Sequence, residues 1–449
     1  MVKTFKFRNM ISQLFCIILM IIFILIFWNL WNDVYRKLAT DPFYEKGSVL
    51  FMFEYLFIYV LFMRIYEGNK IDKLTIFDII YSQTLSLLIS NFIIYIQLCL
   101  LIKTIVTPIP LISMSINQFI IIIVWSWLSK KVYLKSFPPI KMLFIYGNGS
   151  SDNLIEKINK HNDKYIISKI IKSSVGIEKI IKLVDNYDAI VISDVDSQLR
   201  NKVLKYCFSK SIRTYITPKI SDIIISNSEK LHIFDTPLLI SKNDGIAFYQ
   251  KVIKRLFDIL ISLFALIILS PFMLITAILI KLYDGESIVY KQKRLTINNK
   301  EFYLYKFRSM IVNAEEDGKA VLAKENDYRI TPIGRVIRKI RFDELPQLIN
   351  ILKGDMSIVG PRPERPEIAE KYIHDMPEFS FRTKVKAGLT GYAQIMGKYN
   401  TSAYDKLKLD LMYIESYSLM LDLKLMIKTI KILFKSESTE GIIESKADN

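Results

Sequence analysis

The pattern of apolar positions separates the first third of the chain from the rest. Four long apolar stretches lie there, at about Met10 to Leu30, Ser48 to Tyr66, Leu74 to Leu101 and Ile105 to Leu128. Each holds roughly 20 residues, enough for a helix that crosses ~30 Å of hydrocarbon. The pattern therefore predicts a four-helix transmembrane domain over residues 1–137.

Charges at the ends of these stretches indicate their orientation. Basic residues gather before the first stretch and after the fourth, at Lys3, Lys6, Arg8, Lys130, Lys131 and Lys135. Lys103 is nearly alone in the connection between the third and fourth stretches, although Arg36, Lys37 and Lys46 in the first loop weaken the contrast. Basic loops stay on the cytoplasmic side. We expect a multi-pass protein of the cytoplasmic (inner) membrane, with its N-terminus and everything after Lys130 facing the cytoplasm.

After Pro138 and Pro139, short apolar strands alternate with amphipathic stretches. Strands are predicted around residues 142–149, 165–171, 188–194 and 213–218, and helices around 154–160, 176–186 and 198–210. This alternation is typical of a parallel sheet, so we predict a Rossmann-like cytoplasmic domain at 138–245.

The first predicted strand of that domain ends in Gly147-Asn148-Gly149, which resembles the start of a dinucleotide fingerprint. Asp152 stands where the fingerprint has its third glycine, so close packing over a pyrophosphate is not specified. A Rossmann-like module that binds no dinucleotide is favoured over one that does.

A further apolar run, from Leu256 to Ile280, is interrupted by Ser270-Pro271. Proline bends a helix and removes a backbone donor, and each arm alone is too short to cross a bilayer. Basic residues flank the run at both ends, at Lys251, Lys254, Arg255, Lys281, Lys291, Lys293 and Arg294. We predict a re-entrant helix that enters the membrane and returns, with the freed backbone groups satisfied locally by a group such as the Ser270 hydroxyl. A kinked ordinary span is the alternative.

Composition narrows the classes of function. The chain of 449 residues is 51% hydrophobic and has a formal net charge of +17. Such a charge suits nucleic acid, anionic lipid or a polyphosphate substrate, and the apolar stretches favour the last two, so no nucleic-acid partner is expected. The three cysteines are scattered without metal-binding spacing, which indicates packing residues in a reducing compartment.

The strongest candidate for chemistry is the segment 335–354, where the carboxylates Asp343 and Glu344 follow a series of arginines. The arginines recur at every third position, at Arg335, Arg338 and Arg341, and would form one cationic stripe on a helix. A carboxylate attacks a phosphate poorly until cations reduce the repulsion between the two anions. A phosphate site is therefore one interpretation. The other, compatible with it, is that Asp343 caps a helix over 344–353 that ends at Gly354.

Together these motifs resemble those of bacterial sugar transferases of the polyprenyl-phosphate hexose-1-phosphate transferase type, in the monotopic phosphoglycosyl transferase superfamily. The resemblance rests on KRLFDI (254–259), Ser270-Pro271, KFRSM (306–310), RFDELPQL (341–348), GDMSIVGPRP (354–363) and GLTGYAQ (388–394). Ala387 stands where many relatives have proline. The later run 397–418 resembles exopolysaccharide- and capsule-initiating members. The resemblance implies the long form of the family, with a re-entrant helix and a mostly helical catalytic domain at 246–436 and a polar tail at 437–449.

The resemblance also implies a reaction. In relatives the aspartate of the acidic pair attacks the β-phosphate of a UDP-sugar, forms an aspartyl sugar phosphate and releases UMP, and undecaprenyl phosphate then accepts the sugar phosphate. Carried over, Asp343 is the nucleophile and Glu344 holds Mg²⁺. The substrate-binding positions are then Lys306, Arg308, Arg338, Arg341, Pro361, Arg362 and Pro363. Structural alternatives remain for two of these elements, since Arg308 could pair with an internal acid and the Pro-Arg-Pro turn could be only a rigid loop.

The sequence leaves several alternatives open. Lys254, Arg255 and Asp258 either lie near the lipid phosphate or lock the re-entrant helix to the globular part. A homodimer is expected from long-form relatives, and the transferred hexose cannot be read from the motifs. A non-catalytic membrane scaffold and a transporter with a nucleotide-binding domain are competing functions, but the intact motifs speak against the first and the lack of a GxxxxGK[ST] sequence against the second.

Overall fold

A computed structural model describes residues 2–39, 45–147, 151–241, 245–311, 314, 327–397 and 401–433. These residues form two compact units that divide after Thr217. The predicted polar tail at 437–449 lies outside the described residues.

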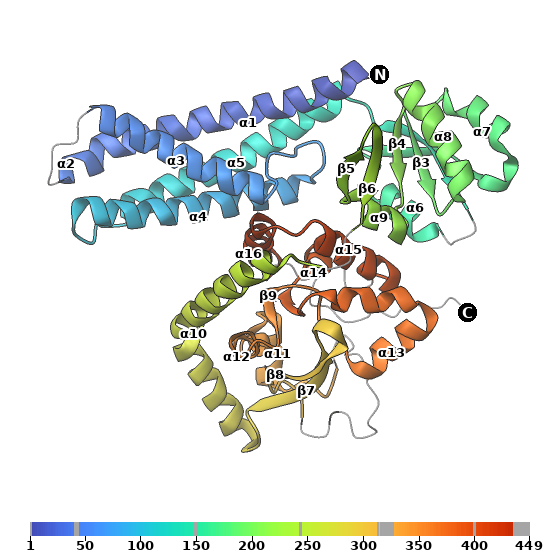
Figure 1. Ribbon diagram of the computed structural model, residues 1–449. Coiled ribbons are helices and arrows are strands. Elements are labelled where there is room, and N and C mark those ends of the chain that lie inside the picture. Colours follow the sequence, from blue (N-terminus) through green and yellow to red (C-terminus); the bar gives the residue numbers. More distant parts are fainter. Residues whose placement is uncertain are drawn as a thin grey trace. The chain divides into compact units, whose positions relative to one another are not determined.

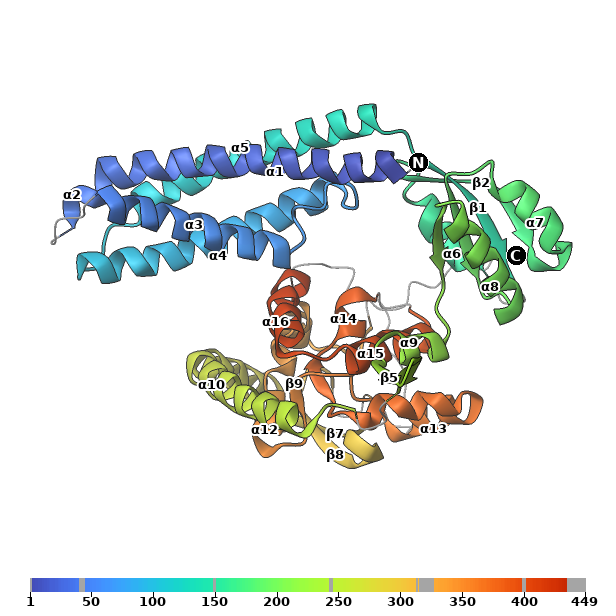
Figure 2. The same ribbon diagram turned by 45° about the horizontal axis from the view of Figure 1, so that its top comes forward.

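The apolar stretches of the first unit form long helices that run side by side (Figure 1, Figure 2). They are α1 (Val2–Leu30), α3 (Glu45–Ile65), α4 (Ile76–Ile102) and α5 (Ile109–Ser136), and α1 continues into the π-helical turn η1 (Trp31–Tyr35) and α2 (Arg36–Leu38). All four are long and apolar enough to cross a membrane, and large apolar side chains are exposed along them. These helices coincide with the predicted stretches, while the number of spans stays a prediction.

Polar side chains connect these helices in the interior of the bundle. The Tyr59 hydroxyl donates to Gln83 Oε1, and Gln83 Nε2 donates to the Gly68 carbonyl at 3.0 Å. Gln118 Nε2 donates to the Tyr55 hydroxyl at 2.8 Å. Apolar packing alone does not fix how neighbouring helices are aligned along their axes. Hydrogen bonds between polar side chains in an apolar surrounding fix that alignment.

The rest of the first unit is a parallel sheet covered on both faces, as predicted. The strands β1 (Ile140–Tyr146), β2 (Tyr165–Lys172), β3 (Ala189–Ser193) and β4 (Arg213–Ile216) pair in the order β2-β1-β3-β4. The helices are α6 (Asp152–Asn159), α7 (Ile177–Val184) and α8 (Ser197–Ser209), with a 3₁₀ turn η2 (Ser173–Val175). Apolar residues of α7 and α8 pack on one face of the sheet, and those of α6 pack on the other.

The glycine at the end of β1 has a packing reason that needs no dinucleotide. A Cβ on Gly147 would lie 1.8 Å from the carbonyl oxygen of Asp194, at the end of β3, so only glycine fits there. Gly149 lies outside the described residues. Asp152, at the position of the missing third glycine, begins α6.

The second unit begins before the predicted boundary at residue 245. It opens with α9 (Ile220–Ser226) and the antiparallel hairpin of β5 (Glu229–Ile233) and β6 (Thr236–Ile240). Ile223 of α9 is buried in the main core of this unit, which explains why the division falls after Thr217.

Most of the second unit is helical around two small pairs of strands. The helical elements after α9 are α10 (Phe248–Asp284), η3 (Ile297–Asn299), α11 (Pro332–Lys339), η4 (Phe342–Glu344), α12 (Gln347–Lys353), α13 (Pro366–Asp375), η5 (Pro377–Lys384), α14 (Tyr392–Met396), α15 (Ala403–Glu415) and α16 (Leu419–Leu433). The strands β7 (Val289–Leu295) and β8 (Glu301–Phe307) form an antiparallel hairpin, and β9 (Ser357–Val359) pairs in parallel with β10 (Gly388–Thr390).

The long helix α10 has its polar side chains buried and its apolar side chains exposed. Lys254, Asp258 and Ser262 are buried, whereas Phe264 and Ile267 are about two-thirds exposed, at 66% and 65%. This is the reverse of a helix on a water-soluble domain, and it suits a helix that lies against lipid. By length and composition α10 could also cross a membrane.

The helix α10 is continuous through Pro271 and changes direction along its length (Figure 1). Pro271 has no amide hydrogen, so the carbonyl of Ile267, four residues earlier, loses its helical donor. The Ser270 hydroxyl donates to that carbonyl at 2.9 Å. The predicted local satisfaction by Ser270 is therefore confirmed, although the chain bends as one helix and does not break into two.

Candidate functional site

The base of the candidate site is the hairpin of β7 and β8. Lys306 lies near the end of β8, opposite Tyr290 of β7, and its ammonium group reaches Glu344. The Nζ–Oε1 distance is 3.1 Å, and the Lys306 side chain is 20% exposed. The hairpin thus places one cation beside the acidic pair.

The turn after α11 delivers the acidic pair and one arginine. The helix ends at Lys339, and Arg341 takes a left-handed backbone conformation with φ of 56°. This reverses the chain, so that Phe342–Glu344 close a single 3₁₀ turn. Arg341 therefore leaves the predicted stripe, because only Arg335 and Arg338 lie on α11.

The prediction that Asp343 caps the following helix is also wrong. The helix α12 begins at Gln347 after Pro346, not at Glu344, and no side chain caps it. The residues before it close with bonds between residues three apart, from Glu344 N to Arg341 O and from Leu345 N to Phe342 O. The predicted end at Gly354 is confirmed, where a φ of 93° favours glycine. The Asp343 carboxylate is therefore free of a capping role.

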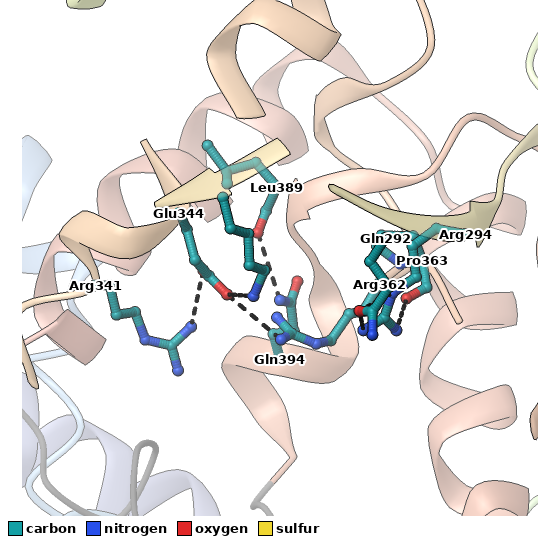
Figure 3. A network of polar contacts seen from close by, with 9 residues as sticks. Gln292, Arg294, Arg341, Glu344, Arg362, Pro363, Leu389 and Gln394 are labelled. Carbon is teal, nitrogen blue, oxygen red and sulfur yellow. Dashed lines mark hydrogen bonds and ion pairs between the residues drawn. The ribbon is translucent and has the colours of Figure 1, made fainter. Parts of the chain in front are cut away.

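Three cations surround the Glu344 carboxylate. Lys306 and Arg362 approach Oε1 at 3.1 and 3.4 Å, and Arg341 approaches Oε2 at 3.7 Å. Figure 3 shows Arg341 and Arg362 reaching this carboxylate from two sides. The Glu344 side chain is 11% exposed, so these contacts are only partly screened by water.

These cations keep Glu344 ionised. Burial alone would raise the pKa of its carboxyl, but Lys306, Arg362 and Arg341 outweigh burial and hold that pKa well below its ordinary value. The same contact raises the pKa of the Arg362 guanidinium. Glu344 is therefore a fixed negative charge whose Oε1 already accepts two donors.

The neighbouring carboxylate differs in every respect. Asp343 is half-buried and has no ion pair or hydrogen bond within the part of the chain that the structure describes. Burial raises the pKa of its carboxyl, the nearby Glu344 charge raises it further, and Lys306 and Arg338 oppose both effects. A carboxylate with unengaged oxygens beside several cations has the properties of a nucleophile towards phosphate.

The buried Arg382 and the half-buried Arg294 hold the Pro361-Arg362-Pro363 turn in place. Arg382 Nη2 donates to the Arg362 carbonyl at 3.1 Å, and Arg294 Nη1 donates to the Pro363 carbonyl at 3.0 Å. Figure 3 shows Arg294 and Gln292 gathered at this turn. The backbone of Arg362 is thus fixed on both sides, while its side chain extends to Glu344.

Comparison with known proteins identifies the second unit. Residues 249–436 match the family described as bacterial sugar transferase. The sugar transferase EpsL of Bacillus subtilis, described as uncharacterized, is 40% identical over 189 residues, which are 42% of this chain and 91% of that protein. The chain belongs to the bacterial sugar transferase family.

Two longer relatives of this sugar transferase are named after specific reactions. The UDP-N-acetylgalactosamine-undecaprenyl-phosphate N-acetylgalactosaminephosphotransferase of Aeromonas hydrophila is 37% identical over 253 residues, 55% of this chain and 59% of that protein. The UDP-glucose:undecaprenyl-phosphate glucose-1-phosphate transferase of Klebsiella pneumoniae is 35% identical over 254 residues, 54% of this chain and 51% of that protein. The chain thus matches less than two thirds of the length of either relative.

The structure brings together most of the predicted substrate-binding residues of this sugar transferase. Lys306, Arg341 and Arg362 surround Glu344, and Arg338 lies close enough to act on the charge of Asp343. The flanking Pro361 and Pro363 are buried and hold the turn, and Arg335 is exposed on α11.

Arg308 does not join this cluster. Its guanidinium Nη2 donates to Asp284 at the end of α10. Arg308 thus pairs with an internal acid, which was the alternative to binding substrate. Arg308 follows β8, and its backbone amide donates to the carbonyl of Ile288, four residues after Asp284 in the chain, which brings Arg308 close to that carboxylate.

The polar residues at the start of α10 lock this helix to the globular part. Lys254 pairs with Asp422 of α16 at 2.5 Å, and Asp258 accepts from the Ile358 amide of β9 at 3.0 Å. Arg255 donates to the carbonyls at the end of α12, to Leu352 at 2.7 Å and to Ile351. Of the two alternatives that the sequence left open, these contacts favour the lock.

Sequence reasoning missed the residues that support the Arg362 turn. Arg382 is 5% exposed and pairs with Asp410 at 2.7 Å and with Glu364 at 3.2 Å. Arg294 is also held, through Gln292 Oε1 at 3.0 Å. None of these residues lies in a motif with a chemical pattern. For Arg382 the available signal was the number of charged residues among the apolar ones between residues 364 and 410, and Arg294 and Gln292 lie outside that segment.

Proposed function

We propose that this sugar transferase moves a sugar 1-phosphate from a UDP-sugar to undecaprenyl phosphate and releases UMP. The observation that carries the proposal is the contrast between the two adjacent carboxylates. Within the described part of the chain the Asp343 oxygens have no partner, whereas Glu344 is held by three cations that would also bind a diphosphate. The names of the two longer relatives support the same reaction class. We propose that the reaction initiates the synthesis of an exopolysaccharide, a capsule or a related glycoconjugate.

The proposed reaction has two displacements at one phosphorus atom. An oxygen of Asp343 attacks the phosphorus that carries the sugar, the bond from that phosphorus to the bridging oxygen breaks, and the electron pair leaves with UMP. A phosphate oxygen of undecaprenyl phosphate then attacks the same phosphorus, and the Asp343 carboxylate leaves with its electron pair. The product is undecaprenyl diphosphate sugar. Arg338 and Arg362 are placed to stabilise the charge that develops on the equatorial oxygens.

The residues present fit a magnesium ion that is shared with the substrate. No group of three or more His, Cys, Asp or Glu side chains gathers within the described ranges, so the protein alone offers few ligands. Magnesium is commonly held by one or two carboxylates together with substrate phosphates. Among the described residues, Glu344 Oε2 is approached by Arg341 alone, at 3.7 Å, which is longer than a hydrogen bond, so Glu344 would hold the ion. When bound, Mg²⁺ would neutralise charge on the diphosphate.

The contacts of α10 support a re-entrant position of this helix in the membrane. The arm before Pro271 is buried against α12, α16 and β9, and the arm after it is buried through Ile280 against Phe307 and Ile337. A helix that crossed the bilayer would carry one arm away from this domain. Both arms on one domain, with apolar side chains outward, favour a domain attached to one leaflet. We propose the cytoplasmic leaflet of the inner membrane, where UDP-sugars are available, and a homodimer.

The test is an assay of purified membranes with a panel of UDP-sugars, namely UDP-N-acetylgalactosamine, UDP-glucose and UDP-galactose. We expect UMP release and lipid-linked sugar with at least one of them. Asp343→Asn is expected to remove both while the protein is still present, and Asp375→Asn, an exposed aspartate on α13, serves as the matched control. Near-normal UMP release by Asp343→Asn would show that this residue is not the nucleophile.

A further inference from the structure

A small pocket lies where the end of α10 meets the start of α11. It offers about 180 Å³ of space, part of which is open solvent at its mouth, and it is lined by Ile280, Tyr283, Asp284, Arg308, Thr331 and Ile333. It is separate from the Glu344 cluster, and the chemistry described so far uses none of its side chains. The proposal below rests on the function proposed above and extends it to the acceptor.

Arg308 is the unusual member of this pocket because its charge is buried and incompletely paired. The residue is 8% exposed, and its Nη2 donates to the carboxylate of Asp284. Its Nε and Nη1 are buried and have no hydrogen-bond partner among the described residues. Buried donors are rarely left in this state, so the arrangement indicates that a further acceptor belongs here.

The start of α11 makes the same pocket favourable for an anion. Thr331 caps the helix, its hydroxyl accepting from the Gly334 amide at 2.9 Å, and Pro332 occupies the first turn. The positive end of the helix dipole therefore points towards the pocket that Thr331 and Ile333 line. Together with Arg308 it provides two independent attractions for a negative group.

The position of the pocket indicates that the anion belongs to a lipid. Tyr283 lines the pocket and is 51% exposed, and Leu282 beside it is 77% exposed, so apolar surface of α10 borders the pocket. The other direction leads to the catalytic cluster. Arg308 follows Lys306 by two residues, roughly 7 Å along an extended chain, and Lys306 contacts Glu344.

We propose that this pocket binds the phosphate group of the acceptor lipid, with Arg308 as the donor. The donor substrate has its own cations around Glu344, which leaves this pocket for the second phosphate. The phosphate of an ordinary bilayer phospholipid has similar chemistry. Such a lipid takes no part in the reaction, however, and the pocket is only two residues along the chain from Lys306, which contacts the acidic pair. The acceptor must approach that pair to receive the sugar phosphate.

Asp284 then has a definite role, because it occupies Arg308 until the acceptor arrives. Its side chain is 27% exposed at the mouth of the pocket, and it accepts a bond from the Glu286 amide at 3.3 Å. A lipid phosphate and this carboxylate compete for the same guanidinium. Removing the carboxylate charge should strengthen acceptor binding, whereas removing the guanidinium should weaken it.

The two half-reactions separate this role from a structural one. The full-length protein in detergent, with the UDP-sugar that proves active, is measured first for UMP released without acceptor and then for product against undecaprenyl phosphate concentration. Arg308→Lys should leave the UMP burst within about twofold of wild type and raise the KM for undecaprenyl phosphate at least tenfold. Asp284→Asn should lower that KM. Equal losses in both half-reactions, or an unchanged KM in Arg308→Lys, would refute the proposal.

Arg329 provides a matched control for a buried arginine. It pairs with Asp327 at 2.6 Å, is 12% exposed and belongs to the same unit. Arg329→Lys should reduce both half-reactions together, in proportion to the folded protein, and should leave the KM for undecaprenyl phosphate unchanged. A selective rise in that KM would show that loss of any buried arginine in this unit produces the effect.

A binding measurement keeps the inference testable even if no UDP-sugar is turned over. In Asp343→Asn protein, farnesyl phosphate should raise the melting temperature, while farnesol and inorganic phosphate should not, and Arg308→Lys should remove the effect. If farnesyl phosphate does not stabilise the protein, the pocket is not an acceptor site, whatever the activity. If binding to phosphatidylglycerol vesicles requires Arg308 but stabilisation by farnesyl phosphate does not, the pocket binds bilayer lipid instead.

Discussion

Glu344→Gln should destabilise the catalytic unit strongly because the carboxylate charge balances three cations. The substitution keeps the shape of the side chain and one acceptor oxygen but removes the negative charge. Lys306, Arg341 and Arg362 then face one another around a neutral amide. The loss is expected from electrostatics alone, since no cavity is created.

The size of the expected loss in the free energy of unfolding depends on how exposed each cation is. Removing one partner of a buried ion pair costs ~3–5 kcal/mol, and a hydrogen bond to a charged group contributes ~1.5–3 kcal/mol. The Lys306, Arg341 and Arg362 side chains are 20%, 25% and 45% exposed, so water relieves part of the cost. We expect a loss of about 2–4 kcal/mol, which for a domain of this class lowers the melting temperature by roughly 5–10 °C.

The assay is the melting temperature of purified wild type and Glu344→Gln in detergent, measured from pH 7 down to pH 4. The pKa of Glu344 lies below its ordinary value of 4.5, so its stabilisation is complete above that value. As the pH falls below 4.5, that stabilisation is lost progressively towards the depressed pKa of the folded state. The difference between the two proteins should therefore be largest at pH 7 and begin to shrink at the acidic end.

Asp343→Asn is the decisive comparison because its sign should be opposite. Burial raises the pKa of Asp343, so its contribution is present at low pH and lost as the pH rises through the raised value. Removing this charge should leave the melting temperature at pH 7 unchanged or higher, with no turnover. If both variants lose stability equally, or if Glu344→Gln melts like wild type, the assignment of different electrostatic states to the two carboxylates is wrong.

Three further outcomes are expected. Arg382→Lys should lower kcat/KM about tenfold or more in the wild-type background but less than twofold in the Arg362→Ala background. The reason is that Arg382 acts by holding the Arg362 carbonyl and so positions the Arg362 side chain. Equal losses in both backgrounds would contradict this. Removing divalent ions with EDTA should stop UMP release and Mg²⁺ should restore it without a change in melting temperature, and activity that persists in EDTA would argue against the metal. Ser270→Ala should cost about 1 kcal/mol because the Ile267 carbonyl loses its donor, whereas Ser262→Ala, whose hydroxyl has no partner among the described residues, should cost less; the two melting temperatures test the order.

The parts of the fold that depend on local patterns could be predicted from the sequence. The strand predicted at residues 165–171 is observed at Tyr165–Lys172, and the helix predicted at 198–210 is observed at Ser197–Ser209. Apolar periodicity and turn residues specify such elements within a few positions. The division after Thr217 could not be read in this way, because it depends on Ile223 packing into a core formed by residues far along the chain.

The candidate site shows the same limit in its detail. The motifs indicated Asp343, Glu344 and the surrounding cations, because those residues are close in sequence or match a family pattern. The left-handed backbone of Arg341, which breaks the arginine stripe, has no local cause such as glycine or asparagine. Pairs such as Arg382 with Asp410, 28 residues apart, arise only when the chain is folded.

The separation of the two carboxylates follows from this turn and not from their chemical type. A helix that began at Glu344 would have made Asp343 a cap and engaged its oxygens with backbone amides. The left-handed Arg341 instead closes a 3₁₀ turn and directs Glu344 towards Lys306, Arg341 and Arg362. Asp343 is left without a hydrogen-bond or ion-pair partner among the described residues. Glu344 is the weaker candidate for the nucleophile, since Lys306 and Arg362 already donate to its Oε1 and the three cations hold its charge in place. The free one is a stronger candidate because neighbouring cations lower the repulsion of an incoming phosphate without occupying its oxygens. The reversal at Arg341 is thus the structural reason to assign attack to Asp343.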